Sequence, residues 1–225
     1  MRHYSIAIDG PAASGKSTTA KGVAGRLGFV YIDTGAMYRA FTLLCLEEGA
    51  DPKNEEECLK LLERCDIYED SEGKIYLNGR DVTERVREKD VTNTVSYTCA
   101  YRDVRVKMVE LQRKMASSVS VVMDGRDIGT VVLKDADLKV YLTASIESRA
   151  KRRLVDNKKR GMPSDYEEIK ADIVKRDYID SHRENSPLSK ADDAIVVDTS
   201  DITIEEEIER IISLFEEKVG KSWKD

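Results

Sequence analysis

The chain has 225 residues, which is ample for one domain core and short for two independent ones. Hydrophobic residues make up 40% and charged residues 36%, and the net charge of −6 argues against a protein that binds nucleic acid through a positive field. The four cysteines form no Cys-x-x-Cys pair and only two histidines are present, which disfavours a zinc site.

The sequence shows no targeting or membrane signal. Asp9 interrupts the first apolar residues, so the start lacks the apolar region of a signal peptide. No apolar run approaches the ~20 residues that a membrane helix needs. We therefore expect a cytoplasmic protein with no membrane and no nucleic acid as partner.

Taken in chain order, short apolar runs alternate with amphipathic segments. The apolar runs predict strands at Tyr4–Ile8, Phe29–Ile32, Val119–Met123, Leu138–Leu142 and Ala194–Val197. Helical spacing of apolar residues predicts helices at 16–27, 36–48, 104–115, 146–159, 166–180 and 203–219. Strands that alternate with helices predict an α/β fold with a five-stranded parallel sheet flanked by helices.

The stretch from 45 to 100 departs from this alternation. Asn54 and Glu57 form a capping-box pattern before a short amphipathic helix. Ile75 and Leu77 then alternate with polar residues between turn signals, which predicts a small antiparallel excursion over 67–82. We interpret this stretch as an inserted subdomain.

A glycine-rich segment lies directly between the first predicted strand and the first predicted helix. Glycines let successive N–H groups turn toward a phosphate, and the positive end of the following helix points at the same anion. Lys16 is expected to reach the β- and γ-phosphates of ATP, and Ser17 to bind Mg²⁺. The segment fits the pattern G-x-x-x-x-G-K-[ST] and predicts an ATP-binding loop made of Gly10, Pro11, Ala12, Ala13, Ser14, Gly15, Lys16, Ser17 and the following Thr18.

Polar segments also follow the second and third predicted strands, where α/β sheets place ligand-binding groups. The first, Asp33–Arg39, offers a flat tyrosine ring and a guanidinium fork for a phosphate. The alternative interpretation of this segment is an ordinary helix start with one buried face. In the second, Asp124–Gly129, Asp124 is placed to act near a metal and Arg126 near transferring charge, while Asp127 could accept from an exocyclic amine. A charged turn with a local Asp–Arg pair is the alternative interpretation.

Together these segments resemble the bacterial cytidylate kinases. The resemblance rests on Ile8–Pro11, the glycine-rich loop, Asp33–Arg39, Asp124–Thr130, and Arg176–Arg183 with the Pro-Leu pair that follows. It implies a P-loop nucleoside monophosphate kinase fold with a core (about 1–33, 111–148 and 190–225), an acceptor-binding insert (about 34–110) and a mobile helical lid (about 149–189). It also implies a monomer that transfers a phosphoryl group from ATP, with Mg²⁺, to CMP or dCMP.

The resemblance also assigns roles to single residues. Thr34 and Arg105 would contact cytosine, with Asp127 on its amino group. The sugar would face Ser96, Arg176 and Asp180. The acceptor phosphate would be held by Arg39, Arg126 and Arg183, which with Lys16 form the expected catalytic set; Tyr38 is expected beside the same nucleotide.

The basic helix predicted at 146–159 admits two interpretations. A run of arginines and lysines on a helix is commonly a solvated face. The alternative is a lid whose Arg149 and Arg153 cover the ATP phosphates, with Arg160 also pointing inward.

Two other functions stay open from the residues alone. The first is another P-loop kinase, which acts on a different monophosphate or on a metabolite alcohol. The second is a nucleotide-sensing switch of the GTPase type. Arg105 and Asp127 favour a nucleobase acceptor over an alcohol, and the sequence has no Asn-Lys-x-Asp guanine signature.

Overall fold

The computed structural model describes residues 2–70, 72–159, 161–220 and 223. The strands of its main sheet are β1 (Ser5–Asp9), β2 (Val30–Asp33), β6 (Val121–Gly125), β7 (Leu138–Thr143) and β8 (Ile195–Asp198). Within the described residues these five strands are all parallel and lie in the order β2-β6-β1-β7-β8. Each lies within two residues of a predicted strand, so the five-stranded parallel sheet is confirmed.

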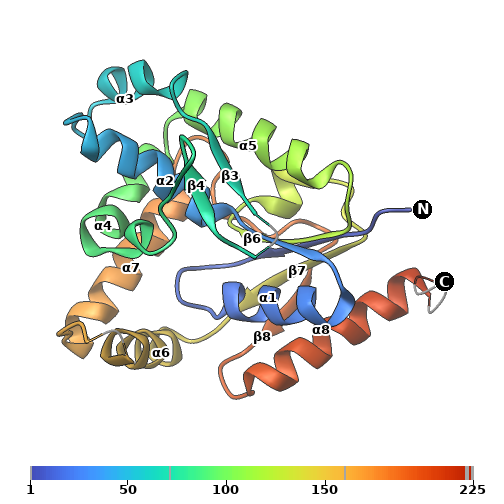
Figure 1. Ribbon diagram of the computed structural model, residues 1–225. Coiled ribbons are helices and arrows are strands. Elements are labelled where there is room, and N and C mark those ends of the chain that lie inside the picture. Colours follow the sequence, from blue (N-terminus) through green and yellow to red (C-terminus); the bar gives the residue numbers. More distant parts are fainter. Residues whose placement is uncertain (1, 71, 160, 221–222, 224–225) are drawn as a thin grey trace.

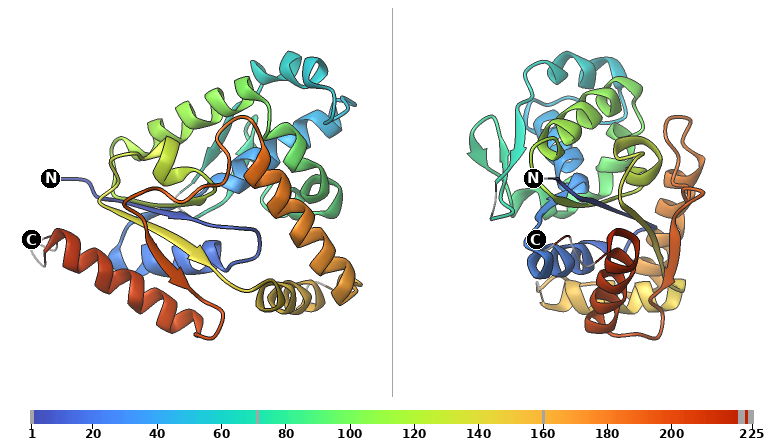
Figure 2. Two further views of the ribbon diagram at one scale, coloured as in Figure 1. Left: turned by 180° about the vertical axis from the view of Figure 1, so that it is seen from behind. Right: turned by 90° about the vertical axis from the view of Figure 1, so that its right-hand side faces the viewer.

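Helices cover both faces of this sheet (Figure 1). Ile6 and Ile8 of β1 pack in the cluster that includes α1 (Lys16–Leu27) and α8 (Ile204–Val219). Ala7, which lies between them in the strand, packs with α2 (Thr34–Glu47) and α5 (Arg102–Ala116) on the opposite face. Because side chains of a strand alternate between faces, one apolar run supplies both halves of the core. Figure 2 shows the resulting three layers from two further sides.

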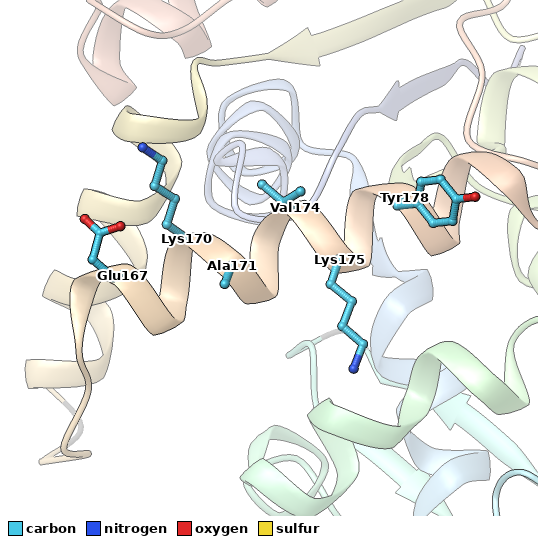
Figure 3. A pocket seen from close by; sticks show the side chains of 6 residues that line it. All are labelled: Glu167, Lys170, Ala171, Val174, Lys175 and Tyr178. Atoms are coloured by element: carbon cyan, nitrogen blue, oxygen red, sulfur yellow. The ribbon is translucent and has the colours of Figure 1, made fainter.

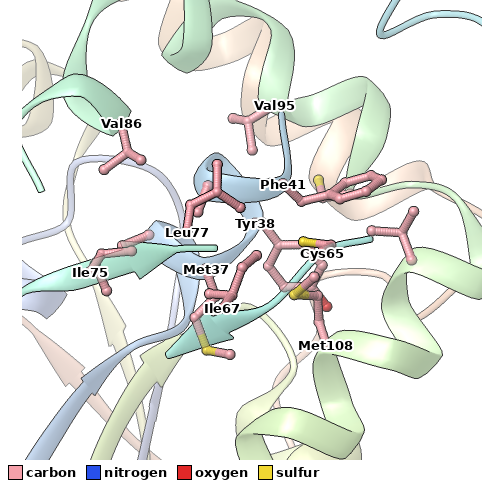
Figure 4. Packing of buried hydrophobic residues seen from close by; sticks show 14 of the residues in the cluster. Met37, Tyr38, Phe41, Cys65, Ile67, Ile75, Leu77, Val86, Val95 and Met108 are labelled. Carbon is pink, nitrogen blue, oxygen red and sulfur yellow. The ribbon is translucent and has the colours of Figure 1, made fainter. Parts of the chain in front are cut away.

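The insert between α2 and α5 is built on α2. It contains α3 (Glu55–Leu62), β3 (Ile67–Glu69), β4 (Ile75–Leu77), β5 (Arg80–Asp81), a 3₁₀ turn η1 (Arg85–Arg87) and α4 (Lys89–Thr98). The three short strands are antiparallel, which confirms the predicted excursion. Figure 4 shows Met37 and Phe41 of α2 packed among apolar side chains of β3, β4, η1 and α4. The α4 helix was not predicted.

Two further helices, α6 (Ile146–Lys159) and α7 (Tyr166–His182), lie side by side beyond the sheet (Figure 1). They pack through a small cluster of Ala150, Ile169 and Ile173, and Ala13 of the glycine-rich loop joins this cluster. The helices covering the loop therefore rest on few apolar contacts, which suits a segment that moves.

The four cysteines are all buried thiols. None of the described helices combines the length and the apolar character that crossing a bilayer requires.

Candidate active site

The carboxyl ends of the central strands open into a cavity of about 810 Å³. Asp33 and Asp124 are paired in register at neighbouring strand ends, and Asp9 is paired with Gly125 beside them. Basic side chains outnumber acidic ones around the cavity, although the chain as a whole is acidic. The predicted site residues that line it are Ala12, Ala13, Ser14, Gly15, Lys16, Ser17, Thr18, Thr34, Tyr38, Arg39, Arg105, Asp124, Arg126, Asp127, Arg153, Arg176, Asp180 and Arg183.

Four predicted site residues do not line the cavity: Gly10, Pro11, Ser96 and Arg149. Gly10 lies where the loop leaves β1, and a Cβ there would stand 2.0 Å from the carbonyl oxygen of Leu142. Pro11 contributes its carbonyl oxygen, which accepts from Lys16 Nζ at 2.7 Å. Gly10 and Pro11 therefore shape the loop from behind rather than from inside the cavity.

The glycine-rich loop leads into α1 without a capping side chain. Gly15 is the N-cap, and no side chain accepts a hydrogen bond at that end of the helix. The first N–H groups of α1 are thus available to an anion, and the positive end of the helix favours one. Burial and the neighbouring Arg126 guanidinium lower the pKa of Lys16 to about 7. A phosphate beside Lys16 would restore its charge, because an anion favours the protonated form.

Oxygen donors for a metal gather where α1 meets the end of β6. Ser17 Oγ donates to Asp124 Oδ2 at 2.9 Å, and the Tyr31 hydroxyl donates to Asp124 Oδ1 at 2.8 Å. Burial and the nearby Asp33 carboxylate raise the pKa of Asp124, so a cation would relieve unfavourable charge there. In the described part of the chain no group of three or more His, Cys, Asp or Glu side chains could hold a metal. The Ser17 hydroxyl and the Asp124 carboxylate beside the glycine-rich loop fit Mg²⁺, which binds few protein groups together with phosphate oxygens and water.

The arginines predicted to hold the acceptor phosphate are each fixed by a carboxylate or a carbonyl. Arg39 Nη2 donates to Asp33 Oδ2 at 3.1 Å, and Arg126 Nε donates to Asp180 Oδ2 at 2.7 Å. Arg183 Nε donates to the Ser186 carbonyl oxygen at 2.7 Å. Such pairing orients the guanidinium groups before a ligand arrives.

Several buried donors around this group have no acceptor in the protein. They are Nε of Arg39, Nε of Arg105, Nε of Arg176 and the hydroxyl of Tyr38. Burial and the neighbouring Arg126 lower the pKa of Arg176 to about 10, as expected where guanidinium groups crowd together. Buried N–H groups without partners are unfavourable, so the arrangement fits an anionic ligand that accepts from them.

A second constellation lies deeper in the acceptor side. Arg105 Nη2 donates to Asp127 Oδ2, and both side chains are buried. The Arg105 guanidinium lies 5.3 Å from the centre of the Tyr38 ring. Thr34 Oγ1 donates to the Asp124 carbonyl oxygen at 2.6 Å. The Asp127 carboxylate can accept and the Arg105 guanidinium can donate hydrogen bonds, and the Tyr38 ring lies beside them. Together these groups suit the polar edge of a small planar base.

The arginines of α6 face different partners. Arg149 Nη1 donates to Asp177 Oδ2 at 2.6 Å and to the Ala12 carbonyl oxygen at 3.0 Å, so its buried side chain ties α7 to the glycine-rich loop. Arg153 lines the cavity, as does Arg152, which donates to the Ser14 carbonyl oxygen at 3.1 Å. Arg160 lies outside the described residues.

The sequence matches known proteins along nearly its whole length. The family model of cytidylate kinase covers residues 6–217. The cytidylate kinase of Lactobacillus johnsonii is 51% identical over 216 residues, which span 95% of this chain and 94% of that protein. The cytidylate kinase of Oceanobacillus iheyensis is 51% identical over 215 residues, spanning 94% of each. The chain belongs to the cytidylate kinase family.

As a member of this family the chain is a nucleotide kinase, a phosphotransferase. Solved structures of more distant proteins share its fold. A gluconokinase from Sinorhizobium meliloti superposes with a TM-score of 0.52 at 14% identity, covering 96% of this chain and 94% of the other. At that identity the likeness supports the α/β kinase fold alone.

A second hollow runs along the outer face of α7 and is lined by Glu167, Lys170, Ala171, Val174, Lys175 and Tyr178 (Figure 3). None of the predicted site residues contributes to it. The cavity at the strand ends, which collects most of them, is therefore the candidate active site of this cytidylate kinase family member.

Sequence reasoning missed four residues that shape the site. Arg87 and Arg152 line the cavity. Asp177 accepts from Arg149 and from Ala12 N of the loop, and Glu207 of α8 accepts from Thr19 beneath the loop. Each acts through a partner far away in the sequence, so no local motif marks it. Arg152 alone had a weak signal in the sequence, because it lies about one helical turn after Arg149, which was itself a predicted site residue.

Proposed function

We propose that the protein transfers the γ-phosphoryl group of ATP to CMP and dCMP, giving ADP with CDP or dCDP. The observation that carries this proposal is that one cavity joins the glycine-rich loop to the buried Asp127–Arg105 pair, with Arg39, Arg126 and Arg183 between them. A metabolite alcohol has no use for such a base-reading pair. The cavity volume of about 810 Å³ is in the range of small-molecule sites.

On the donor side, Lys16 and the N–H groups that begin α1 would bind the β- and γ-phosphates. Ser17 would bind Mg²⁺, with Asp124 beside it. When bound, Mg²⁺ neutralises charge on the phosphates. Arg153 lines the cavity from α6 and would approach the phosphates from the lid. Arg149 would do so only after leaving Asp177 and the Ala12 carbonyl oxygen.

On the acceptor side, Arg39, Arg126 and Arg183 would hold the monophosphate in line with the donor. Arg176 and Asp180 would face the sugar together with Ser96, which is buried just behind the cavity lining. Asp127 would accept from the amino group of cytosine, with Thr34, Tyr38 and Arg105 around the ring.

The transfer needs positioning and charge neutralisation rather than a general base. A phosphate monoester is largely ionised near neutral pH, so its oxygen can attack directly. The cluster of guanidinium groups would balance the charge that develops between donor and acceptor. Closure of the lid (149–189) and of the insert (34–110) would exclude water and so prevent hydrolysis of ATP.

One chain supplies every side chain in this account, so we propose that a monomer is the active form. Light scattering coupled to gel filtration would check it, with a single peak at the mass of one chain expected under assay conditions.

The test of the function is the release of ADP from ATP and Mg²⁺ with CMP, dCMP, UMP, AMP and GMP offered separately. Fast release with CMP and dCMP, slower release with UMP and none with purines is expected. ADP release that is equal with and without an acceptor would point to a hydrolytic switch. Acceptor-dependent release with purines alone would overturn the cytosine assignment.

A further inference from the structure

Asp9 is a buried carboxylate that the proposed contacts with ATP and CMP do not use. It is the last residue of β1, directly before the glycine-rich loop, and only 4% of it is exposed. Its two oxygens accept backbone N–H groups: Ile128 N donates to Oδ1 at 2.8 Å and Gly129 N donates to Oδ2 at 2.8 Å. Asp9 thus binds the segment that directly follows Asp127.

That segment is a π-helical turn, η2 (Ile128–Val132). Val132 N donates to the Asp127 carbonyl oxygen at 3.2 Å, and Leu133 N donates to the Ile128 carbonyl oxygen at 2.7 Å. The first N–H groups of such a turn have no partner within it. Asp9 supplies acceptors for the first two of them from another strand, since the N-cap residue Asp127 makes no side-chain capping bond of its own.

The other end of η2 is held as well. Arg113 of α5 donates from Nε to the Val132 carbonyl oxygen at 3.0 Å and from Nη2 to the Val131 carbonyl oxygen at 2.6 Å. A carboxylate at the N–H end and a guanidinium at the carbonyl end both match the dipole of the turn. The backbone that carries Asp127 is therefore fixed from two sides by charged groups.

Close packing leaves this turn little room to shift. A Cβ on Gly129 would stand 3.1 Å from Lys139 Cδ and 3.4 Å from Asp9 Oδ2. Ile128 is 1% exposed and fills the core on the side of α2 and α5. A displacement of η2 would have to move either the core or the Asp9 carboxylate.

Keeping a carboxylate here is unfavourable in itself. Burial and the nearby Asp127 carboxylate raise the pKa of Asp9 to about 6, while the two amide hydrogen bonds act in the opposite direction. The charge is compensated mainly by the N–H groups that it fixes, with a smaller contribution from the nearby Lys16 charge. The stability of the ionised Asp9 carboxylate therefore depends on the position of η2.

We propose that Asp9 is a positioning residue for recognition of the acceptor base. By fixing the first N–H groups of η2 it holds the backbone of Asp127, so that the Asp127 carboxylate meets Arg105 and the base at a set angle. Asp9 itself touches no substrate. This inference rests on the proposed function, in which Asp127 reads the amino group of cytosine.

The test compares Asp9→Asn with a matched control, Asp137→Asn. Asparagine keeps the shape of Asp9 but leaves one oxygen acceptor and sets an NH₂ group against the other N–H. Asp137 lies near the opposite end of β1, where its carboxylate accepts from Ser5 N at 2.9 Å. We measure kcat and KM for CMP, UMP and ATP, with hydrogen exchange of the amides in η2.

For Asp9→Asn we expect the KM for CMP to rise about tenfold, as for the loss of one charged hydrogen bond, and the preference for CMP over UMP to narrow. The KM for ATP should stay within about twofold, and the η2 amides should exchange faster. Asp137→Asn should leave all three KM values and the η2 exchange unchanged.

Three outcomes would overturn the inference: an unchanged KM for CMP, an unchanged preference over UMP, or a KM for ATP that rises as much as that for CMP. The last would place the effect in the adjacent phosphate loop. If Asp9→Asn does not fold, Gly129→Ala tests the same point, because its Cβ would stand 3.1 Å from Lys139 Cδ and 3.4 Å from Asp9 Oδ2 and so crowd η2 against β1 and β7 without changing charge. Wild-type protein that shows no preference for CMP would instead refute the proposed function.

Discussion

The donor half and the acceptor half of the cavity draw on the chain in different ways. Most of the donor half comes from one continuous segment, residues 10–18, of which residues 12–18 line the cavity and lead into the uncapped start of α1. The acceptor half is assembled from side chains on α2, α5, the β6–η2 segment and α7, which are held by ion pairs across those elements. In the proposed function, local backbone geometry thus recognises the phosphates of the donor, whereas side chains placed by long-range packing recognise the acceptor base and its phosphate.

This difference has a consequence for variants. Changes in the donor half should lower turnover for every acceptor alike, because the same loop serves each reaction. Changes in the acceptor half should alter KM and selectivity among acceptors. Arg39, Arg105 and Arg126 there are each paired with a carboxylate, so removing one partner leaves the other without it in a buried place.

Lys16→Ala should have the largest effect. Loss of its charge beside the transferring group should lower kcat on the order of 10³-fold for CMP and dCMP equally, with no loss of secondary structure. Steady-state kinetics and circular dichroism check this, and Lys21→Ala, an exposed lysine of the same helix, is the control. An unfolded Lys16→Ala protein, or a selective loss for one acceptor, would contradict the account.

Arg126→Ala should come next. It removes a guanidinium from the acceptor phosphate and leaves Asp180 buried without this partner, so kcat/KM for CMP should fall about 100-fold. The KM for ATP should change little. Arg64→Ala, which removes an exposed partner of Glu48, serves as the control. An equal rise in both KM values would show that Arg126 belongs to both halves of the cavity.

Asp127→Asn should change selectivity more than rate. The carboxylate can accept from the amino group of cytosine, while an asparagine NH₂ can donate to the carbonyl oxygen of uracil. The ratio of kcat/KM for CMP over UMP should fall by about tenfold or more. Competition between the two nucleotides in one reaction measures the ratio directly. An unchanged ratio would remove Asp127 from base recognition.

Glu207→Gln should have the smallest effect, on stability alone. Burial raises the pKa of Glu207 above its ordinary value of 4.5, so the folded state binds this proton more tightly than the unfolded state. The stability that depends on Glu207 is therefore present at low pH and lost as the pH rises above that value. From about pH 4 to about pH 8 the free energy of unfolding of wild type should fall relative to that of Glu207→Gln.

Urea unfolding at both pH values measures this difference. As a control, Glu217→Gln, on the exposed side of the same helix, should show the same change of unfolding free energy with pH as wild type. If the unfolding free energy of wild type and of Glu207→Gln changes equally with pH, Glu207 titrates in the folded protein as it does in the unfolded chain, which would contradict the prediction.

The sequence alone predicted what local pattern determines. The five apolar runs, the N-cap at Asn54 and the glycine-rich loop each depend on neighbours within a few residues, and the structure has them where expected. The predicted capping box at Asn54 is formed only in half, because the Glu57 side chain accepts from Asp51 N rather than from Asn54 N. The α4 helix was missed, because its apolar residues are sparse and its stability comes from packing against α2.

The site residues outside the glycine-rich loop could be identified only from the tertiary structure or from the family resemblance. Spacing could not show that Arg149 contacts Asp177 while Arg152 and Arg153 line the cavity, since all three lie within about one turn of α6. Nor could it reveal that Asp9 caps a turn more than a hundred residues away. Those contacts depend on where helices and strands meet in space.

The most direct test of the central claim is ³¹P nuclear magnetic resonance of the protein with ATP, Mg²⁺ and CMP, in which both products are observed at once. We predict that CDP and ADP form in equal amounts, with no inorganic phosphate beyond that of a protein-free sample. ADP and inorganic phosphate without CDP would contradict the account, because the cavity would then pass the phosphoryl group to water rather than to a nucleotide.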